Sequence, residues 1–179
     1  MCIRDRNYVK ALRFYELAAE KNHVEASFKL GQFYERGIGT NKNYRQAAKW
    51  YLQSANSDYG PAQAAIGRLY FWGRGVDKDM LQAQRYLKIA SEKGDAISQY
   101  LLAEIFSSGI GISEDKARAA HFYKLSADQA YAPAQYRLGQ AYQFGRGLKQ
   151  DNVLALNYFR FAAEPVSYTH LTLPTNREV

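Results

Sequence analysis

The chain has 179 residues, of which 47% are hydrophobic and 15% aromatic, so it carries enough apolar side chains for a substantial core. Its single cysteine excludes an internal disulfide, and no apolar run approaches the roughly 20 residues that span a bilayer. Lysine and arginine outnumber aspartate and glutamate by 24 to 17, but the two signs interleave along the chain. This pattern favours a solvated, mildly basic surface over a nucleic-acid site.

Residues 1–6 and 165–179 share no pattern with the sequence between them. Both segments resemble translated sequencing adapters, so we expect that neither is native, and both are left out of the fold prediction. A genuine polar tail is the alternative. If the exclusion holds, the native ends are missing, and the sequence leaves open both a cytoplasmic and a periplasmic or secreted location.

Between these segments, the sequence repeats with a period of 36 residues. Pairs of glycines mark each period, at Gly37/Gly39, Gly73/Gly75, Gly109/Gly111 and Gly145/Gly147. An aromatic ring recurs in another register, at Phe14, Trp50, Tyr86, Phe122 and Tyr158. The period predicts one repeat domain, 7–164, made of a half unit and four further units, 7–23, 24–59, 60–95, 96–131 and 132–164.

Each unit predicts two helices, because its apolar positions recur at helical spacing. Ala26, Leu30 and Tyr34 lie at i, i+4 and i+8 and would share one face of the first helix. Ala47 and Trp50, at i and i+3, begin a similar face on the second helix. A single unit cannot bury these faces, so we expect neighbouring units to stack with the rings packed between them.

The turn between the two helices carries its own signals. The first glycine of each pair suits the left-handed conformation that ends a helix, and the second lets the chain turn back tightly. Asparagine or aspartate then stands where the second helix should begin, in every unit: Asn7, Asn43, Asp79, Asp115 and Asp151. These side chains cap free backbone N–H groups, so we predict no metal site from them.

The segment Ala134-Gln135-Tyr136-Arg137-Leu138-Gly139-Gln140-Ala141-Tyr142, followed by Gly145, Gly147 and Asp151, resembles the Sel1-like repeat, a relative of the tetratricopeptide repeat. The resemblance extends over residues 7–164 and is weakest in the unit 96–131. It implies an all-α solenoid of antiparallel helix pairs wound into a right-handed superhelix. It also implies work as a scaffold or adaptor, as in bacterial members and in eukaryotic quality-control complexes.

Slots that stay constant between units are structural, so specificity is expected in slots that vary. One varying stripe follows positions 25, 29, 32 and 36 of the first helix and their equivalents, and the resemblance places first helices on the concave side. We predict a peptide- or protein-binding groove there, with the candidate residues Lys29, Gln32, Arg36, Arg68, Trp72, Leu101, Glu104, Arg137, Gln140 and Phe144. Packing on the glycine turn or on the next unit is the alternative role for Trp72 and Phe144.

No motif for catalysis, a cofactor or a metal accompanies the repeat. His23 lies at a junction between units and His121 on an exposed helix face, and neither has a partner at metal-ligand spacing. We therefore predict a non-enzymatic, monomeric scaffold for a protein partner of unknown identity, with no nucleic-acid partner. The alternatives are an RNA-binding helical repeat, which Glu25 and Glu104 disfavour, and an accessory region of a longer enzyme or secreted factor.

Overall fold

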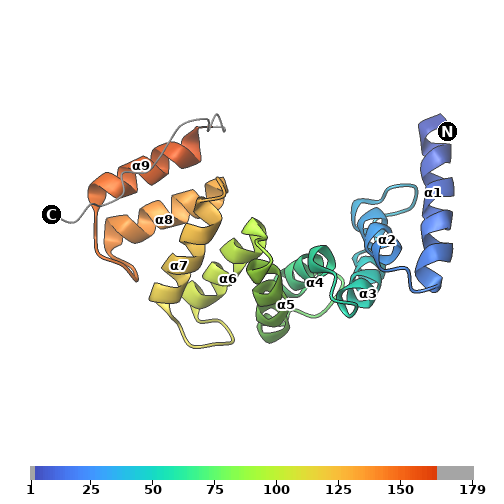
Figure 1. The fold of residues 1–179 in the computed structure, drawn as a ribbon, viewed down its shortest axis with the longest axis horizontal. Coiled ribbons are helices and arrows are strands. Elements are labelled where there is room, and N and C mark those ends of the chain that lie inside the picture. The colour runs from blue at the N-terminus through green and yellow to red at the C-terminus, as the bar shows by residue number, and fades with distance from the viewer. Residues whose placement is uncertain (1–2, 165–179) are drawn as a thin grey trace.

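The computed structural model describes residues 3–164, with side chains from residue 7 onward, and this part of the chain consists of helices and short loops. The helices are α1 (Ile3–Glu20), α2 (Val24–Arg36), α3 (Tyr44–Ala55), α4 (Gly60–Trp72), α5 (Met80–Glu92), α6 (Ala96–Ser108), α7 (Lys116–Ala127), α8 (Ala132–Phe144) and α9 (Asn152–Ala163) (Figure 1). The tail 165–179, which the sequence separates from the repeat, lies outside the described residues. Within them, the all-α solenoid is confirmed.

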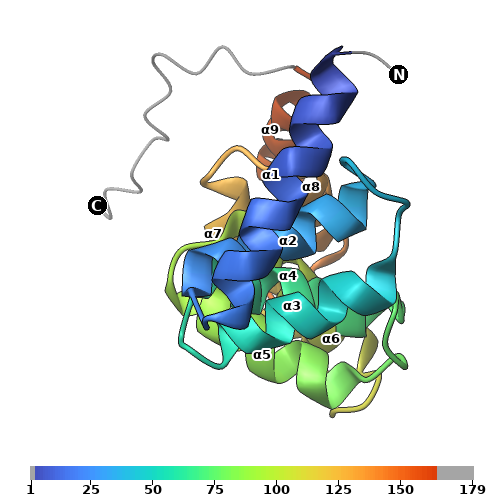
Figure 2. The ribbon, with the colours of Figure 1, turned by 90° about the vertical axis from the view of Figure 1, so that its right-hand side faces the viewer.

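The helices stack in chain order into an arc. Each helix packs on the next, and α4 also contacts α6, the first helix of the following unit. The first helices of the units are α2, α4, α6 and α8, and Figure 1 places α2 and α4 nearer the inner side of the arc than α3 and α5. Figure 2 looks along the stack from its N-terminal end, with α1 lying across the helices behind it. We call the surface that the first helices present to the inner side the concave face.

Capping of the second helices is confirmed in four units. The side chains of Asn43, Asp79, Asp115 and Asp151 each accept a backbone N–H from the first turn of α3, α5, α7 or α9. The prediction for Asn7 is wrong, because α1 already begins at Ile3. No glycine turn precedes Asn7, so nothing in the sequence stops the helix from extending past it.

The first helices begin in two ways. His23 and Asp95 cap α2 and α6 with their side chains, through bonds from the N–H groups of Ala26 (3.3 Å) and Ser98 (2.7 Å). In α4 and α8, no side chain caps the helix, and a proline stands in the first turn, where its missing N–H is not needed. The junction residue His23 is thus explained by helix capping.

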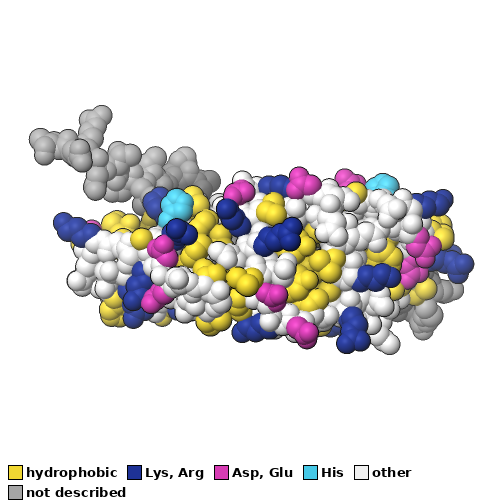
Figure 3. All heavy atoms as spheres, turned by 90° about the horizontal axis from the view of Figure 1, so that it is seen from below, with side chains coloured by type: hydrophobic (Ala, Val, Ile, Leu, Met, Phe, Trp, Pro, Cys, Tyr) yellow, Lys and Arg dark blue, Asp and Glu magenta, His cyan; other side chains and the backbone are white. Residues whose placement is uncertain are grey.

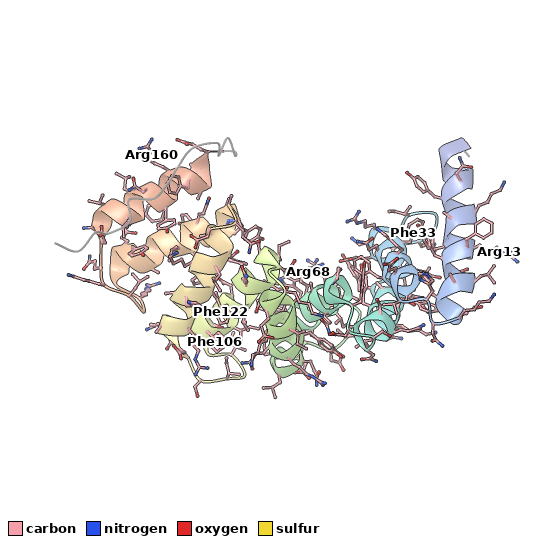
Figure 4. The ribbon with its side chains drawn as sticks, in the orientation of Figure 1. Arg13, Phe33, Arg68, Phe106, Phe122 and Arg160 are labelled. Carbon is pink, nitrogen blue, oxygen red and sulfur yellow. The ribbon has the colours of Figure 1, made fainter. Side chains whose placement is uncertain are left out.

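The repeated rings join the two helices of a unit. Three pairs stack face to face across sixteen positions of sequence, with interplanar angles of 3° to 6°: Tyr70–Tyr86, Phe106–Phe122 and Tyr142–Tyr158 (Figure 4 labels the second pair). Phe14, in the same slot of α1, is 71% exposed. Burial of this slot therefore depends on a first helix packed against it, which α1 lacks among the described residues.

Candidate partner-binding surface

The structure places nine of the ten candidate residues at least partly in solvent. Lys29, Arg36 and Arg137 are exposed, and Gln32, Arg68, Glu104 and Gln140 are half-buried. Trp72 and Phe144 are 44% and 57% exposed, so both rings present apolar surface to solvent. In Figure 4, Arg68 lies on the inner side of the arc, near its middle.

The prediction for Leu101 is wrong. Its side chain is only 3% exposed and belongs to a core cluster with Ala83, Leu87 and Ile105. The cause is the preceding unit. Its residues Phe71, near the end of α4, and Met80, at the start of α5, pack against the cluster that contains Leu101. Leu101 therefore holds α6 to α5 and is not available to a partner.

The two exposed rings of the stripe each lie beside an arginine from the glycine turn that follows them. The Arg74 guanidinium carbon is 5.1 Å from the centre of the Trp72 ring, and that of Arg146 is 4.9 Å from the centre of the Phe144 ring. Such cation–π contacts hold a ring in place without hiding it from solvent. Both rings are thus positioned by their own turns and still present apolar surface.

Three candidate residues meet in one network between α6 and α8. Arg137 Nε and Nη2 approach the two carboxylate oxygens of Glu104 at 2.9 and 3.1 Å, and Arg137 Nη1 donates to Gln140 Oε1 at 3.3 Å. The Tyr123 hydroxyl donates to Glu104 Oε1 at 2.6 Å, so the network also includes α7. Arg68, in contrast, makes no hydrogen bond or ion pair with any described residue.

Buried tyrosines anchor the second helices behind this face. Burial raises the pKa of Tyr51 and Tyr123 well above the usual tyrosine value, and hydrogen bonds to Glu35 and Glu104 add to the effect. Burial also raises the pKa of Tyr158 to about 12. These phenols therefore stay protonated in the folded protein under conditions where an unfolded chain would ionise them.

We expect the free energy of unfolding to fall as the pH rises above 10. There the unfolded chain loses tyrosine protons that the folded chain retains, whereas below about pH 9 both states are protonated and these groups add no pH dependence. The contribution of each such tyrosine should approach a slope of about 1.4 kcal/mol per pH unit near pH 11, where the unfolded phenol is largely ionised. Urea unfolding between pH 9 and 11.5 should show a shallower decline in the Tyr51→Phe/Tyr123→Phe variant; equal slopes would contradict the prediction.

A small polar cleft lies between the units 96–131 and 132–164, which are the third and fourth of the four full units. It has a volume of about 40 Å³, and three cationic residues from three different segments line it: Lys116 at the start of α7, Arg137 on α8 and Arg146 in the last glycine turn. Ser107 and Gln140 complete its polar edge. Comparison of the units along the first helix does not indicate Lys116 and Arg146, because these residues lie at the start of the second helix and in the glycine turn. The same comparison at those two places distinguishes them from their equivalents Met80 and Ile110.

The convex side carries charges of both signs. Figure 3 views the convex side, where basic and acidic side chains are scattered with both signs interspersed. No group of three or more His, Cys, Asp or Glu side chains among the described residues could hold a metal ion. None of the helices described is long and apolar enough to cross a membrane.

Comparison with known proteins identifies the repeat. A family model described as the Sel1 repeat matches residues 4–23, 24–59, 60–95, 96–131 and 132–164. Two solved structures align with 87% of this chain at 30% identity and a TM-score of 0.81: a protective antigen of uropathogenic Escherichia coli with an SLR fold, and a Sel1 repeat protein from Oxalobacter formigenes. The chain spans 33% of the first and 62% of the second.

A more distant structure, the MamA protein, shares the fold, with a TM-score of 0.58 at 23% identity over 91% of this chain and 87% of that one. No curated protein matches the chain. The family model nevertheless covers most of the sequence in five consecutive segments. The chain therefore belongs to the Sel1 repeat family, whose members are helical scaffolds that typically mediate protein interactions.

Proposed function

We propose that this chain is an interaction scaffold that binds an extended peptide or protein segment on its concave face. One observation carries the proposal: positions that vary between units place a guanidinium without an ion pair to any described residue and two exposed rings on the first helices. The positions that stay constant between units hold these helices in place. Arg68 supplies the guanidinium, and Trp72 and Phe144 supply the rings. Arginine and tryptophan are the side chains that most often dominate the binding energy of an interface.

The helices that carry these side chains are held by their ends and by packing on neighbouring helices. The helices α4 and α8 that carry them end in left-handed glycines, Gly73 and Gly145, and pack on α5 and α9 through buried apolar residues. A preorganised surface loses little conformational entropy when a partner binds. The proposal therefore locates recognition in the side chains, with the backbone as a fixed support.

Selection from a displayed library of random peptides tests the proposal. We expect enriched peptides to bind the chain and to lose about tenfold or more in affinity with Arg68→Ala/Trp72→Ala, because each substitution removes one contact of the kind that dominates interfaces. The matched control is Lys88→Ala/Leu81→Ala, which removes one exposed cation and one exposed apolar side chain from α5. Circular dichroism should show that both variants keep their helices.

Two results would contradict the proposal. Equal loss of affinity in both variants would mean that the concave face has no special role. Absence of any enriched peptide, together with salt-sensitive binding of a generic single-stranded RNA that requires Arg68, would favour an RNA-binding repeat instead.

A further inference from the structure

Four slots contribute to the polar cleft and recur with the 36-residue period: one near the end of the first helix, one at the start of the second helix, and two from the following unit, on its first helix and in its glycine turn. At the junction between the second and third units these slots hold Phe71, Met80, Leu101 and Ile110. The first three belong to or pack against one core cluster, and only Ile110, at the rim, is more than half exposed. This junction is sealed by apolar side chains.

The next junction carries polar and basic residues in all four slots. One period later, the same slots hold Ser107, Lys116, Arg137 and Arg146. All four line the cleft of about 40 Å³ described above, together with Tyr123, Gln140 and three alanines of α7 and α8. At the first junction the equivalent residues are Glu35, Tyr44, Ala65 and Arg74, with only one cation. Among the three junctions between the four full units, this one alone has three cations in these slots.

The charge around the cleft is positive even after its neighbours are counted. Glu104 pairs with Arg137 at 2.9 Å, and Glu114 pairs with Lys116 at 3.2 Å. The third cation, Arg146, has a ring contact with Phe144 but no ion pair with a described residue. Three cations and two carboxylates leave an excess of about one positive charge around the cleft, on side chains that three segments contribute.

We infer that this cleft binds the carboxylate of an acidic side chain in the partner segment. A carboxylate carries the single negative charge that the excess requires, and guanidinium groups bind it with strong, charge-assisted hydrogen bonds. A phosphate would bring nearly two charges into a site where Glu104 and Glu114 already neutralise two of the three cations. Because Arg137 and Gln140 belong to both the cleft and the concave stripe, an acidic residue here would continue a segment lying along that face.

This inference rests on the proposed function, but its test needs no identified partner. The probe is the capped tripeptide acetyl-Gly-Glu-Gly-amide, with the glutamine tripeptide as its neutral isostere. Nuclear magnetic resonance of arginine side chains should show saturable shifts of the Nε–Hε signals of Arg137 and Arg146 with the glutamate peptide alone, at millimolar concentration. Equal shifts with both peptides, or none up to tens of millimolar, would overturn the inference. Shifts of the same Nε–Hε signals by inorganic phosphate, at a lower concentration than the glutamate peptide requires, would also overturn the inference.

The apolar residues at the preceding junction, between the units 60–95 and 96–131, suggest which substitutions the cleft can accept. Lys116→Met, Arg137→Leu and Arg146→Ile together install side chains that already pack at the junction between the second and third units, and we expect about a tenfold or larger loss of affinity for the glutamate tripeptide. If the triple variant unfolds, Lys116→Met/Arg146→Ile keeps the Glu104–Arg137 pair and should still lose about fivefold. The control Lys10→Ile/Arg45→Leu/Lys88→Met removes as many charges elsewhere and should change affinity less than about twofold.

Unchanged affinity in the cleft variants would overturn the inference. That failure is distinguishable from failure of the proposed function. Peptides selected from the library could still depend on Arg68 and Trp72 while ignoring the cleft, in which case the concave face binds without it. Conversely, glutamate could bind in the cleft although no selected peptide depends on the concave face.

Discussion

Replacing Gly75 with alanine is expected to lower the free energy of unfolding by about 3 kcal/mol or more. Gly75 has φ of +73°, where an L-residue pays about 1–2 kcal/mol for its Cβ. The added Cβ would also lie only 2.2 and 2.3 Å from the carbonyl carbon and oxygen of Tyr44, in the preceding unit. Backbone atoms cannot rotate aside as a side chain could, so the two units must separate locally.

Urea unfolding followed by circular dichroism measures this effect, and Gly94→Ala is the matched control. Gly94 also has a positive φ, of +88°, but an added Cβ there meets nothing within 4 Å. The control should therefore lose only about 1 kcal/mol, the conformational cost alone. Equal losses in the two variants would show that the close approach between units adds nothing. Hydrogen exchange can confirm that the Gly75 variant opens between α3 and α4, since repeats can unfold in parts.

Replacing Tyr51 with alanine is expected to cost about 3–5 kcal/mol. Tyr51 is 1% exposed, and its ring fills the space between α2 and α3, with the Phe28 ring centre at 5.7 Å. Its hydroxyl donates to Glu35 Oε2 at 2.5 Å. Truncation would leave a cavity and remove this bond, and the close-packed side chains around the ring can relax into the space only in part.

Two variants separate these contributions, again by urea unfolding. Tyr51→Phe keeps the ring and loses only the hydroxyl, so about 0.5–1.5 kcal/mol is expected, because water can reach the half-buried Glu35. Tyr15→Ala removes the ring in the equivalent slot of α1, which is only partly buried, and should cost clearly less than Tyr51→Ala. A Tyr15→Ala cost as large as that of Tyr51→Ala would mean that burial does not control the effect.

Local features of the fold are predictable from the sequence because they depend on residues close together in the chain. The left-handed ends of α2, α4, α6 and α8 follow from glycine, and the starts of α3, α5, α7 and α9 follow from asparagine or aspartate. Asn7 shows the limit of this reasoning. Its residue type suits a cap, but a cap also needs a chain that turns before it, and the residues before Asn7 form a helix.

The candidate surface was predictable only in part. Varying slots of the first helix indicate where specificity could lie, and Arg68, Trp72 and Phe144 do lie there in solvent. Leu101 occupies the same stripe and is buried, because the side chains that cover it come from another unit. Helical spacing predicts the direction of a side chain on its own helix. It does not predict whether side chains from a neighbouring unit bury it.

By itself, the sequence determined the period, the helices, the caps of α3, α5, α7 and α9, the glycine turns and the family, because each of these depends on local preferences repeated every 36 residues. Tertiary structure alone decided which polar side chains meet: Glu104 with Arg137, and Lys116 with Arg146 around one cleft. These residues lie on different helices and turns, up to 42 positions apart. Their approach depends on how closely the units stack, and glycines such as Gly75, which bring one unit's turn against the backbone of the unit before, set that distance.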